Sequence, residues 1–377
     1  MNSTGIKVLF VPTWYFDFGE KNIFTGIFHL EQAQELQKYC NISVWFPFDK
    51  SIKTSFQKTT EHGLTTYRSN WNYPSYYINA INFRHALKRI FREFKPDIIH
   101  AQVAQNAGYN IHHLVPEIRI PVVITEHMPI EMMQLEKKKK HTILNKAFRR
   151  SKANFCVSPN LTSQMKKEFP DITFKCIPNG IRDPYSLNLS KEQFAKENSI
   201  NCSITAGFYD EHVKGFQYLI PAINELIQEG NSIVLHCIGD GKFRRTYEKM
   251  AQKLHIEDNI IFYGHCDHIK TYSIMNQMDF CVSASMFESA GASIQEALLL
   301  GKPCVVTNSG GCSSLVSKDN ALIVEKGKTE TLRYGIEQMI KHLDTYDTGV
   351  IRKNALHDFE ISSVTKRYID EYMQVLS

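Results

Sequence analysis

Short apolar runs alternate with longer amphipathic segments along the whole chain. In the first half, the runs IKVLFVP, ISVWF, DIIHAQ, PVVITEH and ANFCVSP have the length and β-branched content of buried strands. The second half repeats the scheme with SITAG, SIVLHCIG, IIFYG, DFCVSAS and KPCVVTN. Apolar runs separated by helix-length stretches predict parallel strands that are covered by helices on both faces. The pattern therefore predicts an α/β protein of two Rossmann-like domains, with a helix after each strand.

The junction between the two halves is predicted in CIPNGIRDPYSLNLSKEQF. Asn179-Gly180 interrupts regular structure there, and a polar stretch follows. We expect an N-terminal Rossmann-like domain over residues 1–183, a C-terminal Rossmann-like domain over 184–361, and a final helix over 362–377 that could pack on the first domain. Ligands of open parallel sheets bind beyond the carboxyl ends of the strands, so the expected site is a cleft between facing domains.

The composition narrows the class of protein. A chain of 377 residues that is 43% hydrophobic and 22% charged fits two globular domains. No run approaches the roughly 20 apolar residues of a membrane span, and the first segment lacks the apolar core of a signal peptide, so we expect a cytoplasmic protein. The nine cysteines are scattered without a CxxC or a Cys/His cluster, which predicts reduced, mostly buried thiols and no metal site.

The net charge of +5 is concentrated in residues 137–152. This segment, KKKKHTILNKAFRRSK, contains eight lysines and arginines and no acidic residue. One interpretation is a solvated helix face above an apolar stripe that runs from Ile143 to Phe148. The other is contact with an anionic membrane surface, which would place the protein at the inner face of the cell membrane. Nucleic acid is not expected, because the segment lacks interleaved aromatic residues and no recognition motif accompanies it.

Glycine-containing turns follow several of the predicted strands. Gly26 opens the helix HLEQAQELQK, the stretch 207–215 follows SIT, and 239–241 follows IVLHCI. Backbone N–H groups at a helix start favour an anion, although glycine in such a turn is often only structural. Lys214 directly precedes Gly215, where its ammonium group could meet a phosphate; a merely exposed lysine is the alternative. The absence of GxGxxG after the first strand and of GxxxxGK[ST] disfavours dehydrogenases and P-loop proteins.

Three further polar residues stand where the cleft is expected. His127 ends the strand PVVITEH and could donate to a substrate oxygen, act as a base, or be a satisfied structural histidine. Glu288 follows the strand DFCVSAS, and Glu296 lies in the second turn of a helix that starts after Gly291 and ends at Gly301. A carboxylate among small and apolar residues needs partners, and vicinal hydroxyls of a sugar are suitable donors.

The segment FESAGASIQEALLLGKPCVV, in which seven residues separate Glu288 from Glu296, resembles the signature of retaining family-4 glycosyltransferases (glycosyl transferases group 1). KPDIIHAQ, VVITEH, CVSPNL, IPNGI, KGFQYLIPAINEL, CIGDGKFR, IIFYGH and DNALIVEKG occur in the order of that family, so the resemblance covers most of the chain. It implies the GT-B fold, with an acceptor-binding first domain and a nucleotide-sugar-binding second domain. The resemblance further implies metal-independent transfer of a sugar, with retention, from a nucleotide diphosphate to an acceptor hydroxyl. It also implies a glycan or lipid-linked glycan as acceptor and a part in bacterial surface polysaccharide or glycolipid biosynthesis.

The resemblance implies roles for individual positions. Glu296 is expected to bind the ribose hydroxyls, Glu288 the hydroxyls of the donor sugar, and Lys214 the diphosphate. His127 matches a histidine near the reacting sugar, so that His127, Glu288 and Lys214 form the expected catalytic set, and Gly26 approaches the donor phosphate. Donor contacts are also implied for the amides of Ala290, Gly291 and Ala292 and, near the base, for His265.

Two positions depart from the family pattern. The family usually has an arginine directly after the glycine of the first C-domain strand, but this chain has Phe208, so one cation is missing unless Arg182 or another base replaces it. Ser314 stands where an acid is common, which concerns loop structure or donor fit. Phe208 supports a second hypothesis, a GT-B subunit that binds a nucleotide or glycan without transferring a sugar. A sugar-nucleotide epimerase or a phosphorylase of related architecture is the third.

Overall fold

The computed structural model describes residues 5–15, 26–72 and 75–377, and the chain divides into two compact units. Unit 1 comprises Met1–Val157, Leu161–Gly180 and Ile361–Ser377, and unit 2 comprises Ser158–Asn160 and Ile181–Glu360. The main division thus falls three residues before the boundary expected at 183, and the chain returns to unit 1 with its last helix, α12 (Ile361–Leu376).

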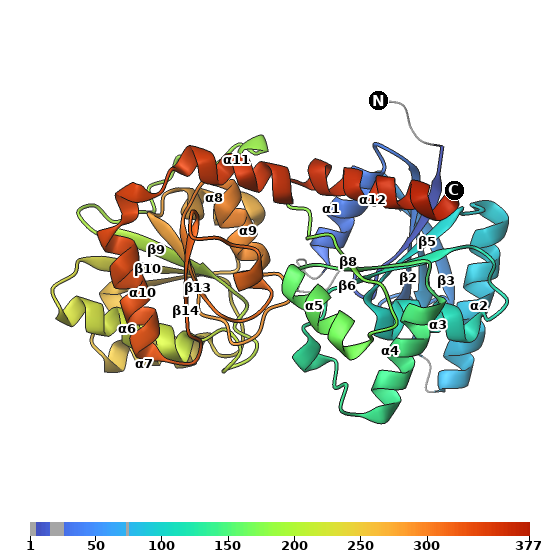
Figure 1. Ribbon diagram of the computed structural model, residues 1–377, viewed down its shortest axis with the longest axis horizontal. Helices are drawn as coiled ribbons and strands as arrows, with labels where there is room; N and C mark the ends of the chain where they lie inside the picture. Colours follow the sequence, from blue (N-terminus) through green and yellow to red (C-terminus); the bar gives the residue numbers. More distant parts are fainter. Residues whose placement is uncertain (1–4, 16–25, 73–74) are drawn as a thin grey trace. The chain divides into compact units, whose positions relative to one another are not determined.

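Unit 1 is built on an eight-stranded sheet of order β3-β4-β2-β1-β5-β6-β7-β8 (Figure 1). Neighbouring strands in it are parallel except β3 and β4. The strands are β1 (Lys7–Val11), β2 (Asn41–Asp49), β3 (Phe56–Glu61), β4 (Leu64–Asn70), β5 (Ile98–Gln102), β6 (Val122–Glu126), β7 (Ala153–Cys156) and β8 (Lys175–Cys176). The α-helices are α1 (Ile27–Leu36), α2 (Tyr76–Glu93), α3 (Tyr109–Leu114), α4 (Lys138–Arg150), α5 (Pro159–Glu168) and α12.

The expectation of a helix after each strand is wrong for β13, which is followed only by the short 3-10 helix Cys312–Ser314 before the next strand, and for β2. Strand β2 is followed by the antiparallel hairpin of β3 and β4, which forms one edge of the sheet. His62 and Gly63 make the turn with φ angles of 47° and 81°, as tight hairpin turns require. The β3 residues FQKTTE are mostly exposed or half-buried, so the segment lacks the continuous apolar run by which the other strands were predicted.

Unit 2 contains a six-stranded sheet of order β11-β10-β9-β12-β13-β14 in which every paired strand is parallel. Its strands are β9 (Ile200–Thr205), β10 (Ile233–Ile238), β11 (Ile260–Gly264), β12 (Phe280–Ser283), β13 (Cys304–Thr307) and β14 (Ala321–Val324). Its helices are α6 (Phe216–Gln228), α7 (Arg244–Lys253), α8 (His268–Asn276), α9 (Ala292–Leu299), α10 (Thr329–Lys341) and α11 (Thr348–Phe359). The predicted α/β class with two Rossmann-like domains is confirmed.

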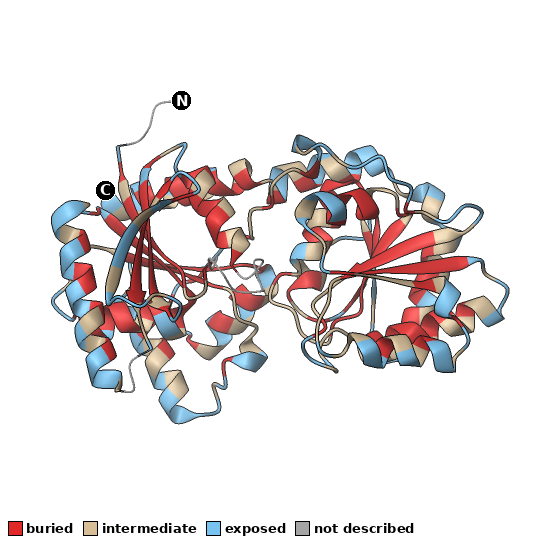
Figure 2. Ribbon diagram, turned by 180° about the vertical axis from the view of Figure 1, so that it is seen from behind, coloured by how far each residue is buried: buried red, intermediate tan, exposed pale blue. Residues whose placement is uncertain are grey.

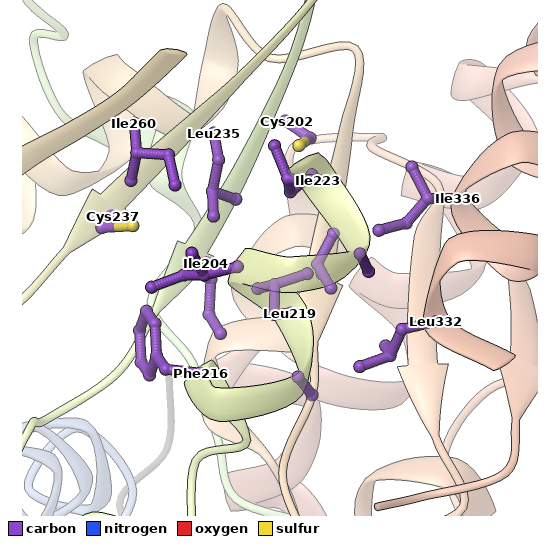
Figure 3. Packing of buried hydrophobic residues seen from close by; sticks show 14 of the residues in the cluster. Cys202, Ile204, Phe216, Leu219, Ile223, Leu235, Cys237, Ile260, Leu332 and Ile336 are labelled. Carbon is purple, nitrogen blue, oxygen red and sulfur yellow. The ribbon is translucent and has the colours of Figure 1, made fainter. Parts of the chain in front are cut away.

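The cores lie between each sheet and its helices, and the helices turn their exposed faces outward (Figure 2). In unit 2, Leu219 and Ile223 of α6 pack with Ile204 of β9 and Leu235 of β10 (Figure 3). Ile336 of α10 belongs to the same cluster. Burying a side chain of this size contributes about 1.5–3 kcal/mol to folding. This packing fixes the sheet against its helices, and the loops at the carboxyl ends of its strands extend from that packed core.

Helix α12 is part of the unit 1 core. Tyr368 and Tyr372 are buried, and Tyr372 Oη lies 2.6 Å from His100 Nδ1 on β5. The other ring nitrogen of His100 lies 2.7 Å from Thr125 Oγ1 on β6, and Tyr368 Oη lies 3.2 Å from the same hydroxyl. The last helix is therefore joined by hydrogen bonds to two central strands of unit 1.

Candidate active site

Lys214 and Glu288 form the centre of the candidate site in unit 2. Lys214 Nζ lies 2.5 Å from Glu288 Oε1, and the two side chains are 28% and 17% exposed. The hydroxyl of Ser285 donates to the same carboxylate oxygen at 3.0 Å. The structure thus brings together the two charged groups to which the sequence assigned the diphosphate and the donor sugar. Because both remain partly exposed, a ligand with an anionic and a hydroxyl group can reach them.

A glycine allows the loop before α6 to approach the loop after β12. Gly215 caps the start of α6 with a φ of 72°, and a Cβ at this position would lie 1.9 Å from the carbonyl oxygen of Ala284. The N–H of Met286 donates to the carbonyl oxygen of Val213 at 2.8 Å. Any larger residue at 215 would push the two backbones apart. The glycine therefore decides how close Lys214 comes to the Glu288 loop.

The loop before α9 is fixed in a similar way. Gly291 caps α9 with a φ of 74°, and an added Cβ would lie 2.9 Å from Cys312 Sγ. A Cβ at Gly311 would lie 2.0 Å from the carbonyl oxygen of Ser289. Glu288 N–H donates to Ser309 O, and Gly311 N–H donates to Glu288 O, at 3.1 and 2.8 Å. Close backbone contact with 309–312 therefore sets the course of 288–291, and of the first amides of α9.

The remaining donor-site candidates of unit 2 lie on neighbouring elements. Glu296 stands in the second turn of α9, and its carboxylate accepts a hydrogen bond from Tyr272 Oη of α8 at 3.3 Å. The helix ends at Leu299, and Gly301 follows with a φ of 75°, which confirms the predicted glycine cap. Ala290 is buried, Ala292 is exposed, and His265 is an exposed residue of the connection between β11 and α8.

His127 follows β6 in unit 1 and is held by two neighbours. Its Nε2 lies 2.7 Å from Gln102 Oε1, and its backbone N–H donates to Glu126 Oε1 at 3.0 Å. Burial lowers the pKa of the His127 imidazole to about 3, so the ring is neutral at neutral pH. The same carboxyl of Glu126 accepts from the N–H of Met128 and of Ala104. Burial raises the pKa of Glu126 to about 7, and these three N–H donors act in the opposite direction.

The backbone packing around Gly26 also requires a glycine at this position. It caps α1 with a φ of 78°, and a Cβ would meet Tyr15 Cα at 2.8 Å and the carbonyl oxygen of Trp14 at 2.9 Å. The glycine therefore permits close backbone packing in unit 1. The rest of the predicted glycine loop, residues 16–25, lies outside the described part of the chain.

Phe208 is a core residue. It is fully buried, and its ring contacts those of Phe216 and Tyr247 with centroids 4.8 and 5.8 Å apart. The position where the family has a cation thus supplies packing to the unit 2 core. Arg182, named above as a substitute, lies beside Ile181, whose N–H donates to the carbonyl oxygen of Phe359. Ser314 Oγ donates to the carbonyl oxygen of Gly311 at 2.7 Å, within its own loop.

Sequence reasoning missed two residues that lie against these groups. Gln102, at the end of β5, contacts His127. Lys326, after β14, donates to the carbonyl oxygen of Met286 at 2.8 Å and lies 4.6 Å from the ring centre of Phe287. Gln102 ends the strand in KPDIIHAQ, and Lys326 follows the strand in DNALIVEKG. Their positions at strand ends are the sequence signal by which they could have been predicted. Their contacts depend on distant segments.

Two features are absent from residues 5–15, 26–72 and 75–377. No group of three or more histidines, cysteines, aspartates and glutamates is placed to hold a metal ion. No helix in those ranges combines the length and the apolar character of a membrane span. The nine cysteines are unpaired, and seven of them are buried.

Comparisons with known proteins identify the family. Residues 190–348 match the family model described as Glycosyl transferases group 1, and residues 30–183 match Glycosyltransferase Family 4. The structure of HepE from Anabaena in complex with UDP resembles this chain with a TM-score of 0.75 at 18% identity, covering 98% of this chain and 100% of that one. The chain belongs to the family-4 glycosyltransferases and has the GT-B fold.

Two curated relatives show how far the similarity of sequence extends. Protein CapJ from Staphylococcus aureus is 32% identical over 134 residues, which are 34% of this chain and 34% of that protein. Alpha-monoglucosyldiacylglycerol synthase from Streptococcus pneumoniae is 21% identical over 306 residues, 76% of this chain and 68% of that protein. The chain thus matches about a third of the first of these relatives and about two thirds of the second.

Proposed function

We propose that the protein is a retaining glycosyltransferase that transfers a sugar from a nucleoside diphosphate sugar to an acceptor hydroxyl without a metal ion. The observation that carries the proposal is the Lys214–Glu288 pair, 2.5 Å apart, between the glycine-dependent starts of α6 and α9. An ammonium group and helix-start amides suit a leaving diphosphate. A carboxylate suits the hydroxyls of the transferred sugar.

In the proposed reaction, the bond between the anomeric carbon and the diphosphate oxygen breaks, and a bond from that carbon to the acceptor oxygen forms on the same face. The acceptor proton leaves with the diphosphate. Lys214 offsets the charge that develops on the leaving oxygen, Glu288 orients the sugar, and Glu296 holds the ribose. His127, as a neutral imidazole, lies near the reacting carbon of the sugar. These roles rest on family membership together with the placement of the side chains.

The first test is thermal unfolding with UDP, GDP, ADP, CMP and their sugar conjugates. A ligand at a hundred times its dissociation constant stabilises the folded state by about 2.7 kcal/mol, which raises the unfolding midpoint of a domain of this size by roughly 5–11 °C. The HepE complex with UDP makes UDP-sugars the first candidates. We expect one nucleotide family to raise the midpoint of unit 2. All three tryptophans, Trp14, Trp45 and Trp71, lie in unit 1, so the measurement requires calorimetry.

The matched control is a second Glu-to-Gln change in unit 2. Glu296→Gln should remove the shift, because the amide accepts less strongly from the ribose. Glu337→Gln, on α10 beside Arg333 and Lys341, should keep it. A well-folded protein that responds to none of the nucleotides would contradict the proposed donor class.

A second candidate is a GT-B subunit that binds a nucleotide or glycan without transferring it. The observation in its favour is Phe208, which occupies the core at the position where the family has an arginine. This candidate predicts a thermal shift without turnover, whereas the transferase predicts both. Release of nucleoside diphosphate in the presence of an acceptor separates the two.

We also propose that the protein works in the cytoplasm at the inner face of the membrane and meets a glycan or lipid-linked acceptor in surface polysaccharide or glycolipid biosynthesis. Helix α4 buries Leu144, Ala147 and Phe148 and exposes Lys138, Lys139 and Lys146. These lysines border an open hollow of about 500 Å³ together with Tyr109. The similarity to alpha-monoglucosyldiacylglycerol synthase supports a lipid acceptor.

Exposed aromatic residues lie at the start of α2, and α3 contacts both α2 and the basic helix α4. Tyr76 and Tyr77 at the start of α2 are 55% and 73% exposed, and Ile78 is 47% exposed. Burial and the neighbouring Tyr109 raise the pKa of Tyr76, and Tyr109 also borders the hollow that the α4 lysines line. Tyrosines beside lysines suit the boundary between lipid headgroups and acyl chains.

Cosedimentation with vesicles tests the membrane contact. The protein should bind vesicles of phosphatidylglycerol and phosphatidylcholine and release them at high salt. Lys138→Glu/Lys139→Glu should weaken binding at least about 30-fold, because each basic residue contributes about 1 kcal/mol. Lys249→Glu/Lys253→Glu on α7 makes the same change of charge and should have little effect. An equal loss of vesicle binding in the two double variants would show that binding depends on the net charge of the protein and not on a contact made by α4.

A further inference from the structure

Gln102 presents an unused hydrogen-bond donor beside His127. Its side chain is fully buried at the carboxyl end of β5, and Oε1 lies 2.7 Å from His127 Nε2. The other atom of the amide, Nε2, is buried without a hydrogen-bond partner in the described part of the chain. Leaving buried donors unpaired costs free energy, and such groups in native structures are few. An amide in this state at a strand end is suited to a ligand.

The backbone around Gln102 is held in a strained conformation. Val103 has a φ of 74°, which is rare for a β-branched residue. Thr13 Oγ1 donates to the carbonyl oxygen of Gln102 at 2.6 Å, and the N–H of Ala104 donates to Glu126 Oε2 at 3.0 Å. Strain of this kind persists only where the surroundings enforce it, and it is concentrated at functional positions. These two hydrogen bonds fix the backbone on either side of the Gln102 side chain, and thereby the position of its amide relative to β6 and His127.

A second buried side chain nearby also lacks partners. His29 of α1 is fully buried, and neither of its ring nitrogens has a hydrogen-bond partner in the described chain. Its ring stands edge-on to that of His127, with centroids 5.1 Å apart. Unsatisfied polar atoms of Gln102 and His29 thus gather around one imidazole. Core packing alone gives no reason for this concentration, whereas a polar ligand does.

The contact also determines which nitrogen of His127 carries the proton. An amide oxygen can only accept, so the neutral ring must donate from Nε2. The titratable groups around the ring are His29 on α1, Glu126 on β6 and His100 on β5. Burial and the neighbouring histidines lower the pKa of both His29 and His100, so these rings add no positive charge at neutral pH. The side chain of Asn179 also hydrogen-bonds to His127.

We propose that Gln102 contacts the substrate: its Oε1 holds His127 in the Nε2–H form, and its free NH₂ donates to a hydroxyl oxygen of the sugar or acceptor that binds at the carboxyl ends of β5 and β6. The inference rests on the proposed transferase function. It adds a donor to a site where the sequence pointed to His127 alone. The expected ligand is a polyhydroxylated molecule, because the amide NH₂ offers a donor without net charge and the imidazole beside it is neutral.

The experiment separates the two halves of the amide. Gln102→Glu keeps an accepting oxygen for His127 and removes the NH₂, whereas Gln102→Met removes both. Gln32→Met is the matched control, because Gln32 is a buried glutamine of the same unit whose side chain bonds to Tyr368. Nitrogen-15 NMR of labelled histidines reports the tautomer of His127, assigned by loss of its signal in His127→Asn. Initial rates report kcat and KM for donor and acceptor.

We expect Gln102→Glu to keep the Nε2–H form but to raise the KM for donor or acceptor by about 10-fold or more, the usual effect of one lost hydrogen bond to a substrate hydroxyl. Gln102→Met should raise it as much and also lose the preference for one tautomer. Gln32→Met should change neither. Normal kinetics in both Gln102 variants, or an equal loss in Gln32→Met, would overturn the proposal. If the wild type is inactive but shows the Nε2–H form of His127, the proposed transferase function is contradicted, while the hydrogen bond between Gln102 and His127 is supported.

Discussion

Replacing Lys214 by methionine is expected to lower kcat/KM for sugar transfer by about 10²- to 10³-fold, the usual effect of removing one preorganised group from a developing negative charge. Methionine keeps much of the length and apolar stem of lysine. Lys214 is 28% exposed and its main-chain position is fixed by Gly215, so the change should leave the fold intact. Initial rates with the donor identified by unfolding, together with calorimetry of the variant, provide the measurement.

Two further variants decide how the result is interpreted. Lys328→Met makes the same change at an exposed lysine of unit 2 that pairs with Glu325 at 2.8 Å, and it should be close to wild type. Glu288→Gln should also be strongly impaired. Because Lys214 and Glu288 share one hydrogen bond, the double variant should lose less than the product of the two single effects. Near-normal rates in both single variants would end the assignment of roles to this pair.

The elements that carry the site could be predicted because they follow local rules. Buried parallel strands appear as apolar runs, so the strands that precede His127 and Glu288 were found. A glycine that ends a helix is a local signal as well, and Gly301 was placed correctly by it. Gly215 and Gly291 can be recognised as turn residues from the sequence. The sequence does not reveal the neighbours that make a glycine necessary, which are the carbonyl of Ala284 for Gly215 and the sulfur of Cys312 for Gly291.

The parts that could not be predicted depend on contacts between distant residues. The Lys214–Glu288 bond joins positions 74 residues apart, and only the fold shows that they meet. Gln102 looked like the last residue of a strand, and its relation to His127 appears when β5 and β6 are paired. Phe208 was identified as a lost cation, whereas its ring belongs to the core of unit 2. Side-chain direction at a strand end cannot be determined from local sequence.

The hairpin that the sequence did not predict contains a buried cluster of charges. Arg68 of β4 bonds to Asp49 of β2 through Nη1 at 2.6 Å and to Glu61 of β3 through Nη2 at 2.8 Å. The three side chains are 3%, 0% and 6% exposed. One arginine therefore pairs with two carboxylates, and it joins the hairpin to β2, the strand next to β1. Such a cluster adds little net stability, but it makes the loss of one member costly.

Arg68→Met is expected to destabilise unit 1 by about 3–5 kcal/mol, because it leaves two buried carboxylates without a partner. Denaturant unfolding followed by tryptophan fluorescence measures it, since all three tryptophans lie in unit 1. Arg84→Met, which breaks the exposed pair of Arg84 with Glu117 at 3.4 Å, should cost no more than about 1 kcal/mol.

The pH dependence of the stability of Arg68→Met identifies why this variant is less stable than the wild type. In the wild type, burial raises the pKa of Asp49, and hydrogen bonds from Ser51 and Arg68 lower it. Without the arginine, the effect of burial is less opposed, so the native state of the variant binds a proton more tightly than the wild-type native state does. The stability deficit of the variant should therefore shrink as the pH falls from 7 to about 4. Adding Asp49→Asn and Glu61→Gln should restore most of the stability at pH 7, because no buried charge then remains. A deficit that is independent of pH and persists in the triple variant would assign the loss to packing of the arginine stem.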